Sequence, residues 1–150
     1  MTFPMGFKWR YFEWGVPLLI VMWALSGCEY EWHLSIRSLD NSGNPTFCVS
    51  ASPGCAHPGV WVSQFTVLEV PEKDTEKPYR VVWSITPMNK EATLKEVVYG
   101  VPPSGYKEEK RPELLRAGQV YQTGEYRFRL SYKDGHWAHE LRPFNQMQTD

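Results

Sequence analysis

The sequence predicts an all-β protein: a small two-sheet antiparallel β-sandwich that follows an N-terminal signal helix. Aromatic residues make up 15% of the 150-residue chain, and 11 Gly and 12 Pro interrupt it frequently. Between these turn formers, short runs alternate apolar and polar residues, and this period of two is typical of half-buried strands. Seven or so such strands over roughly 120 residues fit a sandwich.

The first segment, Trp14–Gly27, is apolar and follows Lys8 and Arg10. It has about half to two thirds of the roughly 20 residues that a membrane-spanning helix needs. A short positive segment, about a dozen apolar residues and then small residues form the layout of an export signal. We therefore expect residues 1–27 to be a signal peptide that is removed from the mature protein.

The apolar run ends in Leu25-Ser26-Gly27-Cys28, which resembles the lipobox of bacterial lipoproteins. In that family the cysteine thiol receives a diacylglycerol, the chain is cut just before the cysteine, and the new amino end is acylated. The resemblance implies that the mature domain, residues 28–150, is tethered to a membrane through Cys28. Acyl chains contribute about 0.8 kcal/mol per buried methylene, so several of them hold a protein on a membrane almost permanently. An uncleaved anchor helix and a plain secreted protein are the alternatives.

Glu29 follows the cysteine, whereas an Asp at that place resembles an inner-membrane retention signal in enteric-type bacteria. We therefore expect a periplasmic protein anchored in the inner leaflet of the outer membrane. Removing Lys8, Arg10 and Glu13 from the 16 basic and 17 acidic side chains leaves 14 and 16. The resulting net charge of about −2 argues against nucleic acid as a partner.

The other two cysteines, Cys48 and Cys55, enclose a short loop that contains Ser-Ala-Ser-Pro-Gly. Two thiols joined by such a loop are expected to form a disulfide in an oxidising periplasm. Closing the loop stabilises the fold by roughly 2–3 kcal/mol. A metal or redox pair is the alternative, but two cysteines seven apart with only His57 nearby do not make a zinc ligand set.

Alternation predicts a first strand over Glu29–Leu39, which ends at a turn cluster rich in Asn, Gly and Pro. A short strand over Thr46–Ser50 then enters the disulfide loop. Val60–Val70 is expected to form one long strand, with Trp61 on the same side as Phe65.

In the second half of the chain, Tyr79–Ile85 is expected to be a central strand with Trp83 in the core, and Thr93–Val101 a further strand. The pattern is clearest at the end, where Tyr126–Tyr132 and His136–Phe144 flank Lys-Asp-Gly. Asp-Gly between two alternating runs is a strong hairpin signal.

Leu115, Gly118 and Tyr121 are spaced three apart. This spacing is similar to the tyrosine corner before the sixth strand of fibronectin type III-like domains, and Trp83 fits the core of such a domain. The resemblance implies an immunoglobulin-like or fibronectin III-like sandwich. A simple turn before a strand is the alternative interpretation.

We expect neither an enzyme nor a cofactor, because the sequence carries no catalytic motif. Ser104 lies in a Pro-Pro-Ser-Gly turn and not in a nucleophile elbow. His136 and His139 are three apart on a strand, so they face opposite sides and suit a shared metal poorly.

A binding role fits the composition better, because Trp, Tyr and Arg anchor many interfaces. Tyr99, Tyr106 and His57 are expected to be free to face a partner. Glu108 and Glu109 belong to the charged run 107–113, which forms either the rim of such a surface or only a solvated loop.

Several short motifs resemble small enterobacterial lipoproteins described as type VI secretion immunity proteins. They are the lipobox cysteine, Phe47-Cys48-Val49 on an early strand, Val101-Pro102-Pro103, and the Leu-x-x-Gly-x-x-Tyr segment before a closing hairpin. The resemblance implies a protein that plugs the active cleft of a toxin from neighbouring cells with an acidic or aromatic loop. The alternatives are an accessory subunit of an envelope or secretion assembly, and a ligand or carbohydrate-binding module with Trp61 or Trp137 as a stacking platform.

Overall fold

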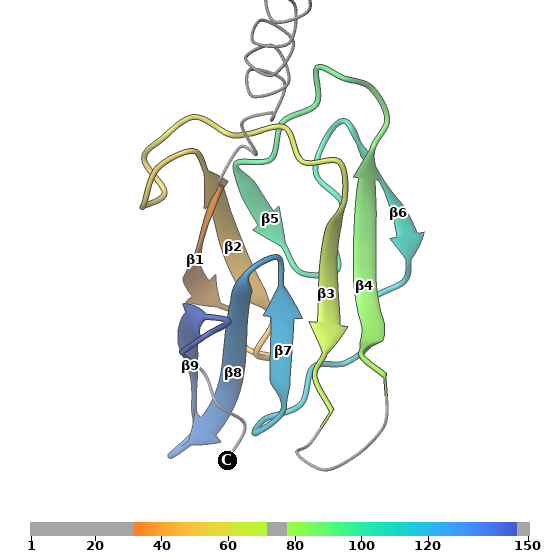
Figure 1. The fold of residues 1–150 in the computed structure, drawn as a ribbon. Helices are drawn as coiled ribbons and strands as arrows, with labels where there is room; N and C mark the ends of the chain where they lie inside the picture. The colour runs from red at the N-terminus through yellow and green to blue at the C-terminus, as the bar shows by residue number, and fades with distance from the viewer. Residues whose placement is uncertain (1–31, 72–77, 147–150) are drawn as a thin grey trace, which may run out of the picture. The chain divides into compact units, whose positions relative to one another are not determined.

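Nine β-strands occur in residues 32–71 and 78–146, the part of the chain that the computed structural model describes (Figure 1). The predicted signal peptide and the predicted lipidation site Cys28 lie outside these residues. Among the described residues, no helix has the length and hydrophobicity that crossing a bilayer requires. The strands are β1 (His33–Leu39), β2 (Pro45–Ser50), β3 (Phe65–Glu69), β4 (Arg80–Pro87), β5 (Glu96–Val98), β6 (Tyr106–Lys110), β7 (Val120–Thr123), β8 (Tyr126–Lys133) and β9 (His136–Pro143).

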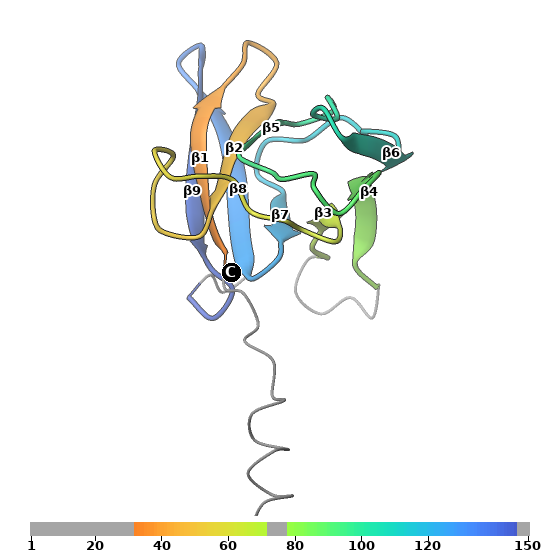
Figure 2. The ribbon, with the colours of Figure 1, turned by 90° about the horizontal axis from the view of Figure 1, so that it is seen from above.

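The strands form two antiparallel sheets, which confirms the predicted β-sandwich. The smaller sheet has the order β1-β2-β5, and the larger has the order β6-β4-β3-β7-β8-β9. The edge strands β1 and β9 contact each other and close one side of the sandwich (Figure 2). The other side carries β5 and β6, the remaining edge strands of the two sheets.

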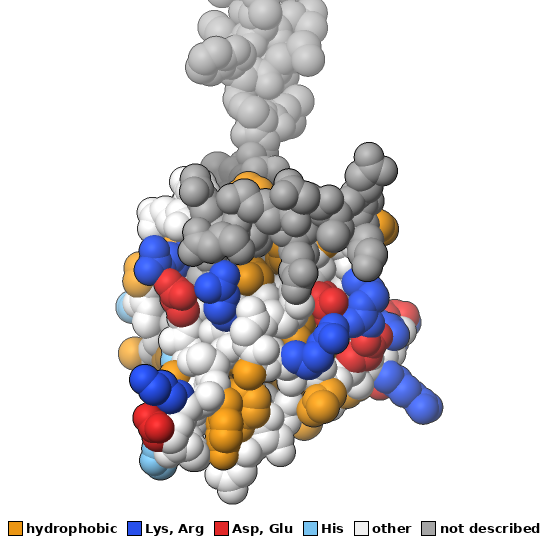
Figure 3. Space-filling model, turned by 90° about the horizontal axis from the view of Figure 1, so that it is seen from below, with side chains coloured by type: hydrophobic (Ala, Val, Ile, Leu, Met, Phe, Trp, Pro, Cys, Tyr) orange, Lys and Arg blue, Asp and Glu red, His pale blue; other side chains and the backbone are white. Residues whose placement is uncertain are grey.

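The sequence pattern does not predict β6, although this strand includes the first four residues of the charged run 107–113. β6 pairs with β4 along one side only. Charged side chains gather on this side of the molecule (Figure 3), and charges on an edge strand disfavour pairing with a further chain. The predicted strand Thr93–Val101 is also shorter than expected. Within this range only Glu96–Val98, strand β5, forms a regular strand. The strand ends there because the chain turns back, and the Val101 N–H donates to the Val98 carbonyl at 2.9 Å.

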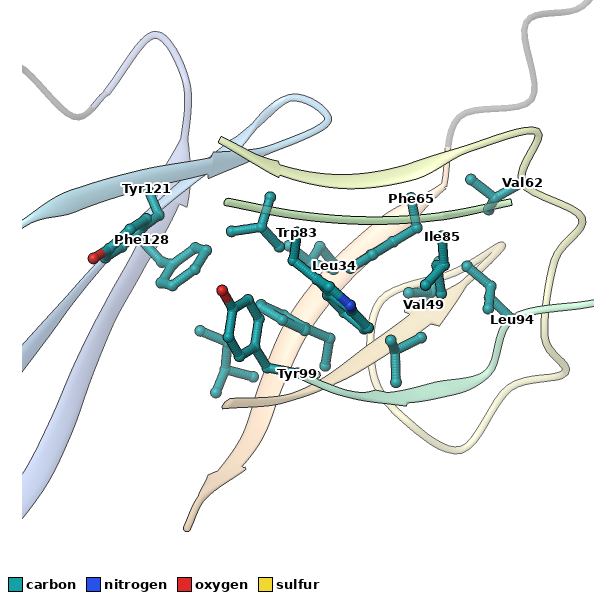
Figure 4. Close-up of a cluster of buried hydrophobic side chains, with 14 of the residues drawn as sticks. Leu34, Val49, Val62, Phe65, Trp83, Ile85, Leu94, Tyr99, Tyr121 and Phe128 are labelled. Atoms are coloured by element: carbon teal, nitrogen blue, oxygen red, sulfur yellow. The ribbon is translucent and has the colours of Figure 1, made fainter. Parts of the chain in front are cut away.

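The core between the sheets is built around aromatic side chains (Figure 4). The ring of Phe47 on β2 lies 5.5 Å from those of Phe65 on β3 and Phe128 on β8. The ring of Trp83 on β4 lies 6.1 Å from that of Phe65. Trp83 is fully buried, which confirms the prediction that it is a core residue. Aromatic pairs with such separations contribute roughly 0.5–1.5 kcal/mol each beyond the area that they bury.

The predicted tyrosine corner is present before β7. The ring of Tyr121 is fully buried, and its hydroxyl oxygen accepts a hydrogen bond of 2.8 Å from the backbone N–H of Arg116. Gly118 has a φ of +84°, which residues with side chains rarely adopt, and its N–H donates to the Leu130 carbonyl at 2.8 Å. These two hydrogen bonds fix the path of the chain into β7. Leu115, Gly118 and Tyr121 therefore belong to a tyrosine corner and not to a simple turn.

Cys48 and Cys55 form the predicted disulfide, with their Cα atoms 5.3 Å apart. Cys48 is a buried residue of β2, so the bond fastens the loop after β2 to the core. Within this loop the Ser50 hydroxyl donates to the Gly54 carbonyl at 3.0 Å. The bend that brings the two sulfur atoms together is thus supported by side-chain hydrogen bonding as well as by the covalent bond.

The predicted long strand Val60–Val70 is wrong, because only Phe65–Glu69 is a strand. Val60 pairs instead with Leu94 as an isolated bridge. Trp61 is half exposed and lies outside the core, whereas Val62 is buried. The chain changes its pairing partner between these residues and β3, and a period-two pattern in the sequence cannot reveal such a change.

Replacing Tyr121 by Phe should lower the free energy of unfolding by about 1–2 kcal/mol, because the Arg116 N–H loses its acceptor while the ring stays in the core. The measurement is urea unfolding at neutral pH. Tyr132→Phe, at an exposed position, is the control and should change the same quantity by less than about 0.5 kcal/mol. Equal losses in the two variants would contradict a structural role for the Tyr121 hydroxyl.

Candidate functional site

The side of the sandwich that carries β5 and β6 is the candidate binding surface, and we call it the open edge. It comprises these two strands and the adjoining segments 99–101 and 111–114. β5 is the outermost strand of the smaller sheet, and β6 is the outermost strand of the larger sheet. Figure 2 shows the chain crossing from one sheet to the other on this side. Both sheets therefore contribute to one surface.

Exposed apolar side chains gather on the open edge. The exposed fractions are 38% for Val98, 58% for Val101 and 79% for Leu114. The segments that carry them touch, because a Cβ atom added to Gly100 would lie 3.2 Å from Cγ of Pro112. We call Val98, Val101, Pro112 and Leu114 the apolar patch. Single exposed apolar residues are common on any protein, but a group of them bordered by charges is typical of contact surfaces.

Tyr99 fixes the apolar patch from beneath, which corrects the expectation that its ring is free to face a partner. The ring is 5% exposed and lies 5.2 Å from that of Trp83. Its hydroxyl donates a 2.6 Å hydrogen bond to the carbonyl of Glu113, the residue between Pro112 and Leu114. The ring thus adds to the core, while the hydroxyl satisfies a backbone carbonyl of the patch.

Tyr106, at the start of β6, is buried as well, which corrects the same expectation for this residue. Its hydroxyl lies 3.3 Å from the Val62 carbonyl and 3.4 Å from the Ala92 carbonyl. It therefore joins β6 to two loops at the end of the sandwich.

Glu108 and Glu109 are exposed on β6 and give the open edge a charged rim. The Glu109 carboxylate accepts hydrogen bonds from the Lys107 ammonium at 2.7 Å and from the Thr86 hydroxyl at 2.9 Å. These bonds, that from Lys107 first, lower the pKa of Glu109 below its usual value, so this carboxyl is ionised at neutral pH. Glu108 accepts a longer bond of 3.4 Å from the indole N–H of Trp83.

An ion network holds the segment after β6 against β3 and β4. Glu113 pairs with Arg80 and with Lys110, and Glu69 pairs with Arg80 at 2.6 Å and with Arg116 at 3.0 Å. Each of these pairs is partly exposed, so each contributes only about 0–1 kcal/mol to stability. Their effect is mainly geometric, because the network fixes the segment that carries part of the apolar patch.

His57 was predicted to face a partner, and the structure places it in the exposed loop 51–64 after β2, away from the open edge. Trp61 is in the same loop. Trp137 packs against Gly43 in the turn between β1 and β2, which is at the other end of these strands. The predicted binding residues therefore do not form one site: Glu108 and Glu109 belong to the open edge, and His57 does not.

Outside the open edge, one hollow of about 400 Å³ lies next to the turn between β7 and β8. Beside it the guanidinium of Arg127 stacks 4.3 Å above the Phe144 ring and donates to the Tyr79 hydroxyl at 2.7 Å. The residues that line the hollow are Gln122, Gly124, Glu125, Pro143, Phe144 and Asn145.

In residues 32–71 and 78–146, no group of three or more His, Cys, Asp or Glu is placed to hold a metal ion.

No family model, curated protein or solved structure matches this chain. Only the residues of the open edge themselves therefore indicate a function. No sequence pattern indicates Val98 or Leu114 as binding residues, and Val101 belongs only to the motif Val101-Pro102-Pro103. Leu114 carries one local signal, since it is an apolar residue directly after Arg-Pro-Glu in a charged run. Its proximity to the segment 98–101 follows only from the fold.

Stability should fall at alkaline pH because of the buried tyrosines. Burial is the largest cause that raises the pKa of Tyr99, Tyr106 and Tyr121 above the usual value of 10.0. Folding thus favours the neutral hydroxyls, and this stabilisation is present below about pH 10 and is lost as the pH rises above it. We expect urea unfolding between about pH 8 and pH 11 to show this decrease, with a smaller slope for Tyr99→Phe. Stability that is independent of pH over this range would contradict the burial of these hydroxyls.

Proposed function

We propose that this protein is a periplasmic lipoprotein, anchored through Cys28, that acts by binding another protein at the open edge. We also propose that the partner is a toxin delivered by type VI secretion, so that the chain serves as an immunity protein. The observation that carries the proposal is the apolar patch. Its three aliphatic side chains are exposed by 38% to 79% on segments that a partly buried hydrogen bond holds in place.

The apolar patch has the anatomy of a protein contact surface. Interfaces combine an apolar centre that excludes water with a polar rim. Leu114 and Val101 supply the centre, and the charged side chains of β6 supply the rim. Fully burying a Leu or Val side chain contributes about 1.5–3 kcal/mol relative to leaving it exposed. A partner that covers the patch therefore gains a substantial part of its binding free energy from burying these two side chains.

The patch is also ordered before a partner arrives. Tyr99 bonds the Glu113 carbonyl, and the ion network holds Glu113 from the other side. Association is weakened when loops and side chains must be ordered on binding, so a surface that is already fixed retains more of its contact energy. Tight binding of this kind is what inhibition of a toxin requires.

The carboxylates on the rim suit a basic cleft. Glu109 is already paired with Lys107, whereas Glu108 makes only a long contact with the Trp83 indole. Glu108 is thus the carboxylate that is better placed to pair with a cation of the partner. A toxin whose active cleft binds an anionic substrate presents such cations, and opposite charges raise the rate of association.

Replacing Leu114 by Asp should abolish protection against the cognate toxin. An aspartate at the centre of the contact must be desolvated on binding, so we expect affinity to fall by about 100-fold or more, or about 3 kcal/mol. The assay expresses the product of the neighbouring gene, as the candidate toxin, in the periplasm of a sensitive bacterium together with the full lipoprotein, and follows growth. Titration calorimetry with the detergent-solubilised lipoprotein measures the affinity.

Tyr132→Asp is the matched control, because it adds the same charge at an exposed aromatic residue at the end of β8, outside the open edge. We expect it to protect as the unaltered chain does. Full protection by both Leu114→Asp and Val101→Asp would exclude the open edge as the toxin-binding surface. If the unaltered chain gives no protection and instead binds an envelope-assembly protein through the same patch, the accessory role replaces immunity.

A further inference from the structure

Three loops meet at the end of the sandwich where β1 begins, and we call this surface the loop end (Figure 1). They are loop 51–64 after β2, loop 88–95 after β4 and the segment 102–105 before β6. His33, the first residue of β1, pairs with Ser50, the last residue of β2. The start of the described domain and the disulfide loop therefore lie at the same end.

The loop end presents apolar side chains on an uncharged loop. Charged residues make up 22% of the chain, so loop 51–64 would hold about three at that frequency; it contains no Asp, Glu, Lys or Arg. Trp61 in this loop is 50% exposed, and Met88 in the neighbouring loop is 61% exposed. The loop of Trp61 is uncharged, whereas loop 88–95, which carries Met88, also contains Lys90, Glu91 and Lys95. An exposed Trp on an uncharged loop suits an environment that is less polar than water.

Backbone hydrogen bonds fix this surface. The Val60 N–H donates to the Leu94 carbonyl at 2.8 Å, and the Leu94 N–H donates to the Val60 carbonyl at 2.7 Å. The Tyr106 hydroxyl contacts the carbonyls of Val62 and Ala92. Because its neighbours Val60 and Val62 are buried, Trp61 is held in an outward position and does not depend on a mobile loop for its exposure.

The length of the tether determines what the loop end can meet. Cys28 is five residues before His33, so the chain between them spans at most about 17 Å. The eight-residue strand β8 extends for about 26 Å, so the end of the sandwich away from the loop end lies farther from the anchor. A lipid on Cys28 therefore keeps the loop end within reach of the bilayer surface.

We propose that the loop end is a bilayer-facing surface, with Trp61 seated at the level of the lipid headgroups. This inference rests on the lipid anchor in the proposed function. Trp is favoured at membrane interfaces because its ring is largely apolar while its N–H can bond to water or lipid. Loop 51–64 contains no charged residue, so it enters this region without the cost of desolvating a charge.

The test uses the full chain, processed and lipidated in cells and then reconstituted into phosphatidylcholine vesicles. The acyl chains of these lipids carry bromine near the glycerol, and bromine quenches only nearby Trp emission. We expect quenching relative to unbrominated vesicles, and we expect Trp61→Phe to remove a large share of it. Trp137→Phe is the matched control and should retain the quenching, because Trp137 lies at the other end of the strands. Trp32 and Trp83 are present in both variants and contribute equally to them.

Equal quenching in the two variants, with both bound to the vesicles, would overturn the bilayer-facing orientation and leave the anchor and the toxin-binding proposal intact. Failure of the chain to float with the vesicles would overturn both the anchor and this inference. A loss of toxin affinity in Trp61→Phe, without any change in quenching, would assign the loop end to a protein partner instead.

Discussion

Three buried tyrosine hydroxyls hold the connections between the strands of this domain. Tyr99 bonds a carbonyl of the apolar patch, Tyr106 bonds carbonyls of two loops at the loop end, and Tyr121 accepts the N–H of Arg116 before β7. Backbone groups that are covered by the fold need hydrogen-bond partners, and irregular connections do not supply them from their own backbone. Each ring fills the core while its hydroxyl meets this need. The position of the apolar patch therefore depends on Tyr99, that of the loop end on Tyr106, and the entry into β7 on Tyr121.

Local signals were sufficient for the closing hairpin and for the tyrosine corner. Asp134 and Gly135 both have positive φ, 54° and 83°, as the predicted two-residue turn between β8 and β9 requires. The corner depends on residues that are only a few positions apart in the chain. The sandwich itself follows from the number and spacing of such local elements, which is why its class could be predicted without any knowledge of the pairing between strands.

Features that depend on distant contacts could not be predicted. The bridge between Val60 and Leu94 removes residues 60–62 from β3, and nothing near Val60 in the sequence indicates that partner. Tyr99 follows a short strand and resembles a loop residue, but its hydroxyl bonds a carbonyl 14 residues further along the chain. The apolar patch exists because Gly100 and Pro112 approach each other. Alternation along one segment contains no information about such approaches.

The domain separates two proposed contacts on different surfaces. The loop end lies where the chain enters β1, and the open edge lies along β5 and β6, away from the closed side formed by β1 and β9. If the chain is tethered through Cys28, contact with lipid at the loop end leaves the open edge accessible to a partner in the periplasm. Anchoring and partner binding then use different residues and do not compete.

The tether at Cys28 can be tested most directly by the intact mass of the protein from the membrane fraction of a Gram-negative host. We expect a chain that begins at Cys28 and carries the added mass of its acyl groups. A chain that begins at Met1, or one that is cut but unmodified and recovered in the soluble fraction, would contradict the tethered arrangement.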